Sequence, residues 1–360
     1  MYLLKRLLLM IPTLLGITLL TFFIMKLAPG DPVSLKLMFA GEGISPQALA
    51  TEMAKSSDPL ILPEWYQNTV KKISHKIHGN KPKESFTEKS LLWLGKNFFH
   101  YGKWLNNLTH LDLGISKKDM RPVSTKIKEA LPLTLTLNII TILIVHGISI
   151  PLGIWSAVKA SKFWDRVLML KLFILYSLPT FWVATLLVVF LAGGEYFDWF
   201  PLMGLHSEGA EKLSWMPYLL DMGWHLVLPI LASVYGSFAF LSRFTRSTVL
   251  EVIHMDYIRT ARAKGLSEGK IIFKHVLRNS LIPLISLSGT LLPALLGGSI
   301  MIEQIFGIPG MGMLSFEAVL GRDYNVIMGL STITAFLTLV SLLLADLAYS
   351  WVDPRISYSN

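Results

Sequence analysis

Six stretches of this chain are apolar enough to cross a lipid bilayer, and they constrain the fold more than any other feature. They are Leu7 to Leu27, Leu133 to Val158, Val167 to Ala192, Leu226 to Leu241, Leu281 to Ile302 and Val326 to Trp351. A bilayer core about 30 Å thick needs roughly 20 apolar residues per helix. With a mean hydropathy of +0.52 and 16% charged residues, the chain is not a soluble globular protein. The sequence predicts an all-α integral membrane protein with six transmembrane helices.

The first stretch follows Lys5 and Arg6, as the apolar part of a secretory signal peptide also would. That part spans only about 7 to 15 residues in a signal peptide, whereas the run here is longer. We therefore interpret residues 1–28 as an uncleaved transmembrane helix. Residues 29–132 are expected to form a long external loop, either a small folded cap or, over Lys71 to Lys103, a flexible basic spacer. Residues 133–360 then hold the other five helices.

The distribution of lysine and arginine predicts the orientation in the membrane. Residues 242–280 carry eight basic residues against three acidic ones, whereas residues 193–224 carry five acidic residues against Lys212 alone. Short loops rich in Lys and Arg stay in the cytoplasm, and loops longer than about 60 residues cross largely regardless of charge. We therefore expect residues 242–280 and both termini to be cytoplasmic. The net charge of +9 is explained by the membrane topology and by attraction to anionic lipid, and we expect no binding of nucleic acid.

The predicted spans hold few ionisable groups, and His146 and Asp346 are the deepest of them. Ion-coupled carriers need acidic or histidine relays at membrane depth. We expect both residues to make structural hydrogen bonds or helix contacts, although an ion-coupled secondary transporter remains the alternative function. A membrane enzyme is a third class, but the chain has no cysteine and no His-Glu-x-x-His pattern, and no span clusters Ser, His and Asp. No catalytic residue, cofactor site or metal site is predicted.

The cytoplasmic segment contains a basic helix-turn-helix pattern. Residues Glu251 to Gly265 predict a first helix that ends at Gly265 in a left-handed cap, and a second helix is expected from Ser267 to about Asn279. A transporter driven by a separate soluble motor needs such a structured cytoplasmic surface. An amphipathic helix lying at the membrane interface would show the same pattern. The residues alone leave both interpretations open.

The sequence Asp256-Tyr-Ile-Arg-Thr-Ala-Arg-Ala-Lys-Gly-Leu266, with His275-Val-Leu-Arg-Asn279 beyond it, resembles the EAA loop of binding-protein-dependent ABC importers. It is most similar to the B-type permeases for dipeptides and oligopeptides. Of the family's Glu-Ala-Ala and Gly positions, only Ala261 and Gly265 match, but the whole segment is close to the peptide-permease version. Further landmarks agree in order over nearly the whole chain: Gly16-Ile-Thr18, Ala28-Pro-Gly-Asp-Pro32, Asp112-Leu-Gly-Ile-Ser116, Ile150-Pro-Leu-Gly153, Glu303-Gln-Ile-Phe-Gly-Ile-Pro-Gly-Met-Gly312, Arg322-Asp-Tyr324 and Val352-Asp-Pro-Arg-Ile356. The long first loop is more similar to the branch that takes up microcins and longer peptides.

This resemblance implies a type I importer permease fold with a coupling helix between helices 4 and 5, in a region of about residues 243–280. It implies a bacterial inner-membrane complex with a second homologous permease, which is more often a different chain than a second copy. The complex would also contain two ABC ATPases, which bind ATP and magnesium. An external binding protein would deliver the peptide substrate. The chain itself has no Walker A motif, because Gly265-Leu-Ser-Glu-Gly-Lys-Ile271 has the wrong glycine spacing and ends in Ile.

The resemblance also implies two groups of site residues. The ATPase-coupling group is Tyr257, Ile258, Arg259, Ala261, Arg262, Lys264, Gly265 and Leu266. Among these, Tyr257, Ile258 and Leu266 are expected to fill a groove of the ATPase, and the three basic residues to bond its acidic or carbonyl groups. The external gate or scoop loop comprises Glu303, Phe306, Pro309, Gly310, Gly312 and Asp323. That loop either dips toward the translocation path or is a plain reverse-turn connector.

Overall fold

The computed structural model describes residues 2–27, 66–72, 86–194, 196–289 and 291–352. This part of the chain is mostly helical and contains no β-strand. Of the predicted external loop, residues 29–65 and 73–85 lie outside the described residues, as does the predicted closing motif beyond Val352. The chain forms two compact units. Unit 1 comprises residues 1–8, 127–316 and 334–360, and unit 2 comprises residues 9–126 and 317–333.

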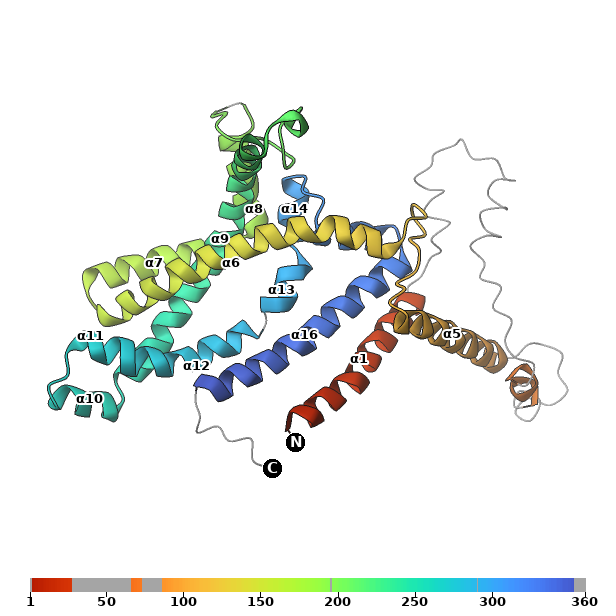
Figure 1. Cartoon of the computed structure of the whole chain (residues 1–360), viewed down its shortest axis with the longest axis horizontal. Coiled ribbons are helices and arrows are strands. Elements are labelled where there is room, and N and C mark those ends of the chain that lie inside the picture. The colour runs from red at the N-terminus through yellow and green to blue at the C-terminus, as the bar shows by residue number, and fades with distance from the viewer. Residues whose placement is uncertain (1, 28–65, 73–85, 195, 290, 353–360) are drawn as a thin grey trace. The chain divides into compact units, whose positions relative to one another are not determined.

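Figure 1 labels the helices in their order along the chain. The longer helices and the short helices near the C-terminal end are α1 (Tyr2–Leu27), α5 (Phe86–Thr109), α6 (Val123–Val158), α7 (Phe163–Ser177), α8 (Thr180–Leu191), α9 (Trp215–Ile253), α12 (Leu277–Ser288), α13 (Leu291–Gly297), α14 (Ile300–Ile305), α15 (Met311–Leu320) and α16 (Tyr324–Val352). Between α9 and α12 lie α10 (Asp256–Ala263), α11 (Glu268–Lys270) and a π-helical turn, η3 (Ile271–Val276). A short 3-10 helix, η2 (Ala210–Lys212), precedes α9.

Four helices among the described residues are long and apolar enough to cross a membrane: α1, α6, α9 and α16. Two bent helix pairs meet the same test, so up to six spans are present if each pair counts as one. The pair α7 and α8 bends by 92° and the pair ending in α14 bends by 44°. Pro179 caps the start of α8, and its ring prevents α7 from continuing as one straight helix. The predicted third span, Val167 to Ala192, is therefore two helices.

Two long helices extend beyond the apolar runs that predicted them. Helix α6 begins at Val123, ten residues before the expected start, because Val123, Ile127 and Ala130 are buried at helical spacing. Helix α9 has 39 residues and continues past Leu241 to Ile253. Buried Ser242, Thr245, Val249 and Val252 line one face of that extension. Apolar composition locates the membrane-spanning part, whereas packing decides where each helix ends.

Each unit has its own apolar core. In unit 1, α6, α8, α9 and α14 share a cluster that includes Leu137, Ala184, Leu228 and Ile302. In unit 2, Phe22 and Met25 of α1 pack with Tyr101 of α5 and Met328 of α16. The Oγ1 atom of Thr18 and the hydroxyl of Tyr101 share a hydrogen bond of 2.8 Å, which fixes α5 along α1.

Candidate functional site

The chain between α9 and α12 folds into a compact hairpin of two short helices (Figure 1). Helix α9 ends at Ile253, and extended backbone at Met255 starts the separate helix α10 at Asp256. The prediction of one helix from Glu251 to Gly265 is therefore wrong. The expected left-handed turn is confirmed, because Gly265 has a φ of +78°. A residue with a Cβ adopts that conformation at a cost of about 1 to 2 kcal/mol.

The predicted second helix does not end near Asn279. It begins with α11 at Glu268, passes through the π-helical turn η3 and continues as α12 to Ser288. No glycine or proline interrupts residues 270–282, so the backbone has no reason to leave the helix there. The side chain of Asn279 stays within this helix, donating a hydrogen bond of 3.0 Å to the His275 carbonyl. The hairpin is thus joined to α12 without a break.

The inner side of α10 is apolar and buried. Ile258 is 0% exposed and Ala261 is buried beside it, packed against Val249 and Val252 of α9. Ile271 and Val276 of the π-helical turn complete the same cluster, and Ala157 adds the end of α6. Ile258 lies beneath the surface, so the expectation that it fills an ATPase groove is corrected: it fastens α10 to α9. Leu266 packs against this cluster while remaining partly exposed.

The outer side of α10 is polar and basic. The Arg259 side chain is 71% exposed, with a weak surface ion pair of 3.6 Å to Asp256, and Lys264 is exposed at the turn. Tyr257 is 41% exposed, and its hydroxyl accepts a hydrogen bond of 2.6 Å from the Asn279 amide. These residues leave a surface that another protein can contact.

Arg262 has a different position from the other basic residues. Its guanidinium donates two hydrogen bonds, of 2.7 and 3.2 Å, to the Glu268 carboxylate across the turn. These bonds raise the pKa of Arg262 above its usual value. Arg262 therefore closes the hairpin at its surface. It is less available to a partner than Arg259 or Lys264.

A buried ion pair lies close to the hairpin along α9. Arg246 donates hydrogen bonds of 2.9 and 2.8 Å to the two oxygens of Asp165, which is 2% exposed at the start of α7. The same carboxylate accepts hydrogen bonds from Ser156 Oγ of α6 at 2.5 Å and from the Ser161 amide at 3.0 Å. Three helices are therefore joined at one point. Sequence reasoning missed this pair. The closeness of Ser156, Ser161 and Asp165 along the chain could have indicated hydrogen bonds to Asp165 at the start of α7.

A cavity of about 590 Å³ lies in unit 1 between α6, the bend of α7 and α8, α9 and α12 to α14. Its lining combines aromatic and aliphatic side chains with hydroxyl, amide and imidazole groups, among them Asn138, Thr141, His146, Tyr176 and Ser237. This volume falls in the range of small-molecule sites. His146 Nδ1 donates to the Ile142 carbonyl at 2.9 Å, which is the structural role expected for it.

Asp346 also has a structural role. Its carboxylate forms an ion pair of 3.0 Å with Arg6, and this contact connects the beginning of α1 with α16. This contact agrees with the expected helix contact. It gives no support to a proton or sodium relay centred on Asp346.

The predicted external loop is organised around Glu303, which is 0% exposed. Its carboxylate accepts hydrogen bonds from Thr134 Oγ1 at 2.9 Å and from the Met313 amide at 2.8 Å. A Cβ on Gly310 would lie 2.5 Å from the Glu303 carboxyl carbon, and one on Gly312 would lie 2.8 Å from the Ile300 nitrogen. The glycines thus let the backbone close around a buried carboxylate. Phe306 is buried in the adjoining core, so Glu303 and Phe306 hold the loop together from within.

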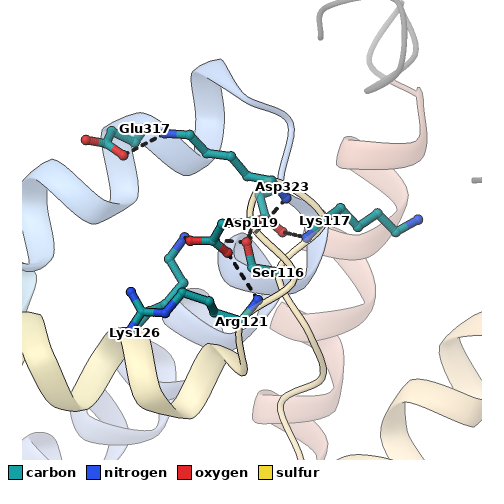
Figure 2. Close-up of polar contacts among 8 residues, drawn as sticks. Ser116, Lys117, Asp119, Arg121, Lys126, Glu317 and Asp323 are labelled. Atoms are coloured by element: carbon teal, nitrogen blue, oxygen red, sulfur yellow. Dashed lines mark hydrogen bonds and ion pairs between the residues drawn. The ribbon is translucent and has the colours of Figure 1, made fainter. Parts of the chain in front are cut away.

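Asp323 belongs to unit 2 and has its own partners (Figure 2). Its carboxylate accepts a short hydrogen bond from Ser116 Oγ and one of 3.2 Å from the Lys117 amide. Asn325 adds a hydrogen bond of 2.7 Å to the Ile115 carbonyl, and Lys118 forms an ion pair of 2.8 Å with Glu317. The motifs Asp112 to Ser116 and Arg322 to Tyr324, about 200 residues apart, are therefore direct partners. No local sequence signal could pair them.

Comparison with known proteins gives one consistent family. The sequence profile of the family described as "Binding-protein-dependent transport system inner membrane component" matches residues 149–358. The chain is 36% identical over 374 residues to the inner membrane ABC transporter permease protein YejB of Escherichia coli O157:H7, covering 100% of this chain and 99% of that protein.

Two further relatives cover nearly the whole chain. The oligopeptide transport system permease protein AppB of Bacillus subtilis is 38% identical over 358 residues, 99% of each chain. The peptidoglycan transport system permease protein YejB of Agrobacterium fabrum is 34% identical over 381 residues, 100% of this chain and 98% of that protein. With its apolar helices and these full-length relatives, the chain belongs to the binding-protein-dependent transport system inner membrane component family.

Proposed function

We propose that this chain is the membrane subunit of an ATP-driven importer that passes peptides or peptide-like compounds across a bacterial inner membrane by alternating access. The full-length relatives named for oligopeptide and peptidoglycan transport support this class of substrate. A second homologous permease, two ATPases and an external binding protein complete the transporter, and both termini face the cytoplasm. ATP and magnesium bind to the ATPases, and this chain holds no cofactor.

The hairpin of α10 and α11 is the observation that carries the coupling role. Its apolar side is fixed to α9 and to the π-helical turn, while Tyr257, Arg259 and Lys264 remain on the surface. A force applied to that surface reaches α9 through Ile258 and α12 through the continuous helix. Rigid elements of this kind transmit a displacement between two discrete arrangements. The ATPases supply the displacement when they close on ATP.

The cavity in unit 1 supplies a part of the substrate path. Its mixture of aromatic surface with hydroxyl and amide groups suits a ligand whose backbone is constant and whose side chains vary. Selectivity among peptides then rests with the external binding protein. The loop around Glu303 serves as an external gate beside this path.

The experiment that tests the coupling role compares aspartate at two glycines of the hairpin. Gly265→Asp places a side chain and a negative charge at the left-handed turn, whereas Gly269→Asp places the same charge in α11, where the glycine has open space around it. We expect Gly265→Asp to lose at least tenfold in uptake of a radiolabelled tripeptide, with normal amounts of the chain in the membrane. Gly269→Asp is expected to retain most of the uptake. Wild-type uptake by the Gly265 variant would contradict the coupling role.

A further inference from the structure

A second hollow of unit 1 is a groove of about 770 Å³ between α7 and α9, which pack along each other. Its apolar wall includes Leu170 and Phe173 of α7 and Phe244 of α9. Among the described residues that line the groove, Arg243 and Arg246 of α9 are the charged ones. The coupling and transport roles proposed above use neither the groove nor Arg243.

The two arginines differ in their partners. Arg246 donates two hydrogen bonds to the buried carboxylate of Asp165, so its charge is paired. The guanidinium carbon of Arg243 lies 5.7 Å from the centre of the Phe173 ring and 5.8 Å from that of Tyr176. Within the described part of the chain, the Arg243 guanidinium forms neither an ion pair nor a hydrogen bond. The groove therefore holds one positive charge without an acidic partner.

The groove adjoins the larger cavity proposed for the substrate path. Tyr176 and Phe240 line both spaces, and their rings stack with centres 6.2 Å apart. Among its described lining residues, the larger cavity has no aspartate, glutamate, lysine or arginine. A charged group of a ligand in that cavity therefore finds no opposite charge within it. Next to the stacked pair, the guanidinium of Arg243 supplies one positive charge.

The surroundings of Arg243 suit a carboxylate. A guanidinium presents five N–H donors in a planar fork that matches the two oxygens of a carboxylate. Contact with aromatic rings attracts the cation and leaves these donors available for hydrogen bonds. The apolar residues Leu170, Phe173 and Phe244 lower the local dielectric constant, which strengthens a charge-assisted hydrogen bond. Every unmodified linear peptide ends in such a carboxylate, whereas its side chains vary.

We propose that Arg243 binds the C-terminal carboxylate of the transported peptide, an assignment that rests on the proposed peptide import. The peptide backbone then lies along Tyr176 and Phe240, which border both the cavity and the groove. The subunit thereby prefers peptides with a free C-terminus, whatever their side chains.

The test measures peptide binding to the purified transporter without nucleotide and without the external binding protein, so that the selectivity of that protein does not enter. Trialanine and its C-terminal amide are each titrated, and saturation-transfer NMR gives the two dissociation constants. Hydrogen bonds to a charged group contribute a factor of about ten in affinity, so the wild type is expected to bind trialanine about tenfold more tightly than the amide. Arg243→Gln is expected to bind both peptides equally.

Two further variants separate the fork of Arg243 from charge alone. Lys171→Gln is the matched control, because Lys171 is an exposed base on α7 that lines neither the groove nor the cavity. It is expected to keep the tenfold preference for trialanine. Arg243→Lys retains the charge but lacks the planar fork, so it is expected to keep a smaller preference.

Equal affinities of the two peptides for the wild type, or no binding of either, would overturn the assignment. An unchanged preference for trialanine in Arg243→Gln would overturn it as well. If stoichiometric phosphatidylglycerol displaces trialanine from the wild type, Arg243 serves a lipid headgroup and the peptide assignment is wrong. Trialanine uptake by the same transporter with its binding protein tests the import separately. Uptake without a carboxylate preference in binding refutes the role of Arg243 alone, whereas absence of uptake by the wild type refutes the import on which it rests.

Discussion

Replacement of Arg246 by glutamine is expected to destabilise unit 1 where α6, α7 and α9 meet. The substitution removes both hydrogen bonds to Asp165, a carboxylate that is 2% exposed. Breaking one side of a buried ion pair costs about 3 to 5 kcal/mol, because the other charge stays buried without its partner. Ser156 and Ser161 still donate to Asp165, and the Arg246 side chain is 23% exposed, so we take the lower value of about 3 kcal/mol.

The assay is the apparent melting temperature of the purified transporter, followed through this chain. A loss of about 3 kcal/mol corresponds to a decrease of about 4 °C for a chain of 360 residues. Arg243→Gln is the control, because Arg243 lies one turn away on α9 and contacts only the rings of Phe173 and Tyr176 in the described structure. That variant is expected to lose about 1 kcal/mol or less. The double variant D165N/R246Q should regain part of the lost stability. Equal melting temperatures for Arg246→Gln and Arg243→Gln would refute this reasoning.

Three further predictions concern single carboxylates. Asp346→Asn should leave peptide uptake within about twofold of wild type and independent of the proton gradient, because Asp346 pairs with Arg6; loss of uptake that follows the gradient would favour the ion-coupled alternative. Glu303→Ala should lower the melting temperature by an amount that corresponds to about 3 kcal/mol and open residues 298–313 to protease, since two buried donors lose their acceptor; unchanged proteolysis would contradict this. For Asp119, partial burial opposes ionisation, but hydrogen bonds from the Lys126 ammonium and the Arg121 amide help to outweigh it and lower the pKa to about 2. Its folded pKa lies below the unfolded value near 4, so the stability difference between wild type and Asp119→Asn should be constant above pH 5 and shrink as pH falls from about 4 to 2; a difference that persists at pH 2 would contradict this cause.

Local chemistry in the sequence predicted the features that depend on neighbouring residues. The apolar runs located the spanning helices, because each helix satisfies its own backbone in lipid. Gly265 predicted the left-handed turn, since glycine adopts it at the least cost. The ring of Pro179 divides the third apolar run into two helices that meet at a bend of 92°. Each of these signals acts within a few residues of its cause.

Features that depend on packing between distant segments escaped sequence reasoning. The residues around Ile258 are the same whether its side chain faces a partner protein or packs against α9. Only the folded hairpin shows that Ile258 is buried within the chain. Asp323 pairs with Ser116 across about 200 residues. Glu303 is an ionisable residue, which sequence reasoning expects at a surface, yet in the structure it is buried among glycines. A polar residue in a chain like this one is assigned to a surface or a core only by its three-dimensional neighbours.

Site-specific cross-linking from the hairpin tests the central claim most directly. The chain has no cysteine, so Arg259→Cys gives a single thiol on the outer side of α10, and Phe273→Cys gives one at an exposed position outside α10. A short thiol-reactive photo-cross-linker is attached to each in the assembled transporter, and the products are identified by mass. The coupling role predicts an adduct between this chain and an ATPase subunit from position 259 and a much weaker one from position 273. Absence of an ATPase adduct at 259 in a complex that still imports peptide would contradict it.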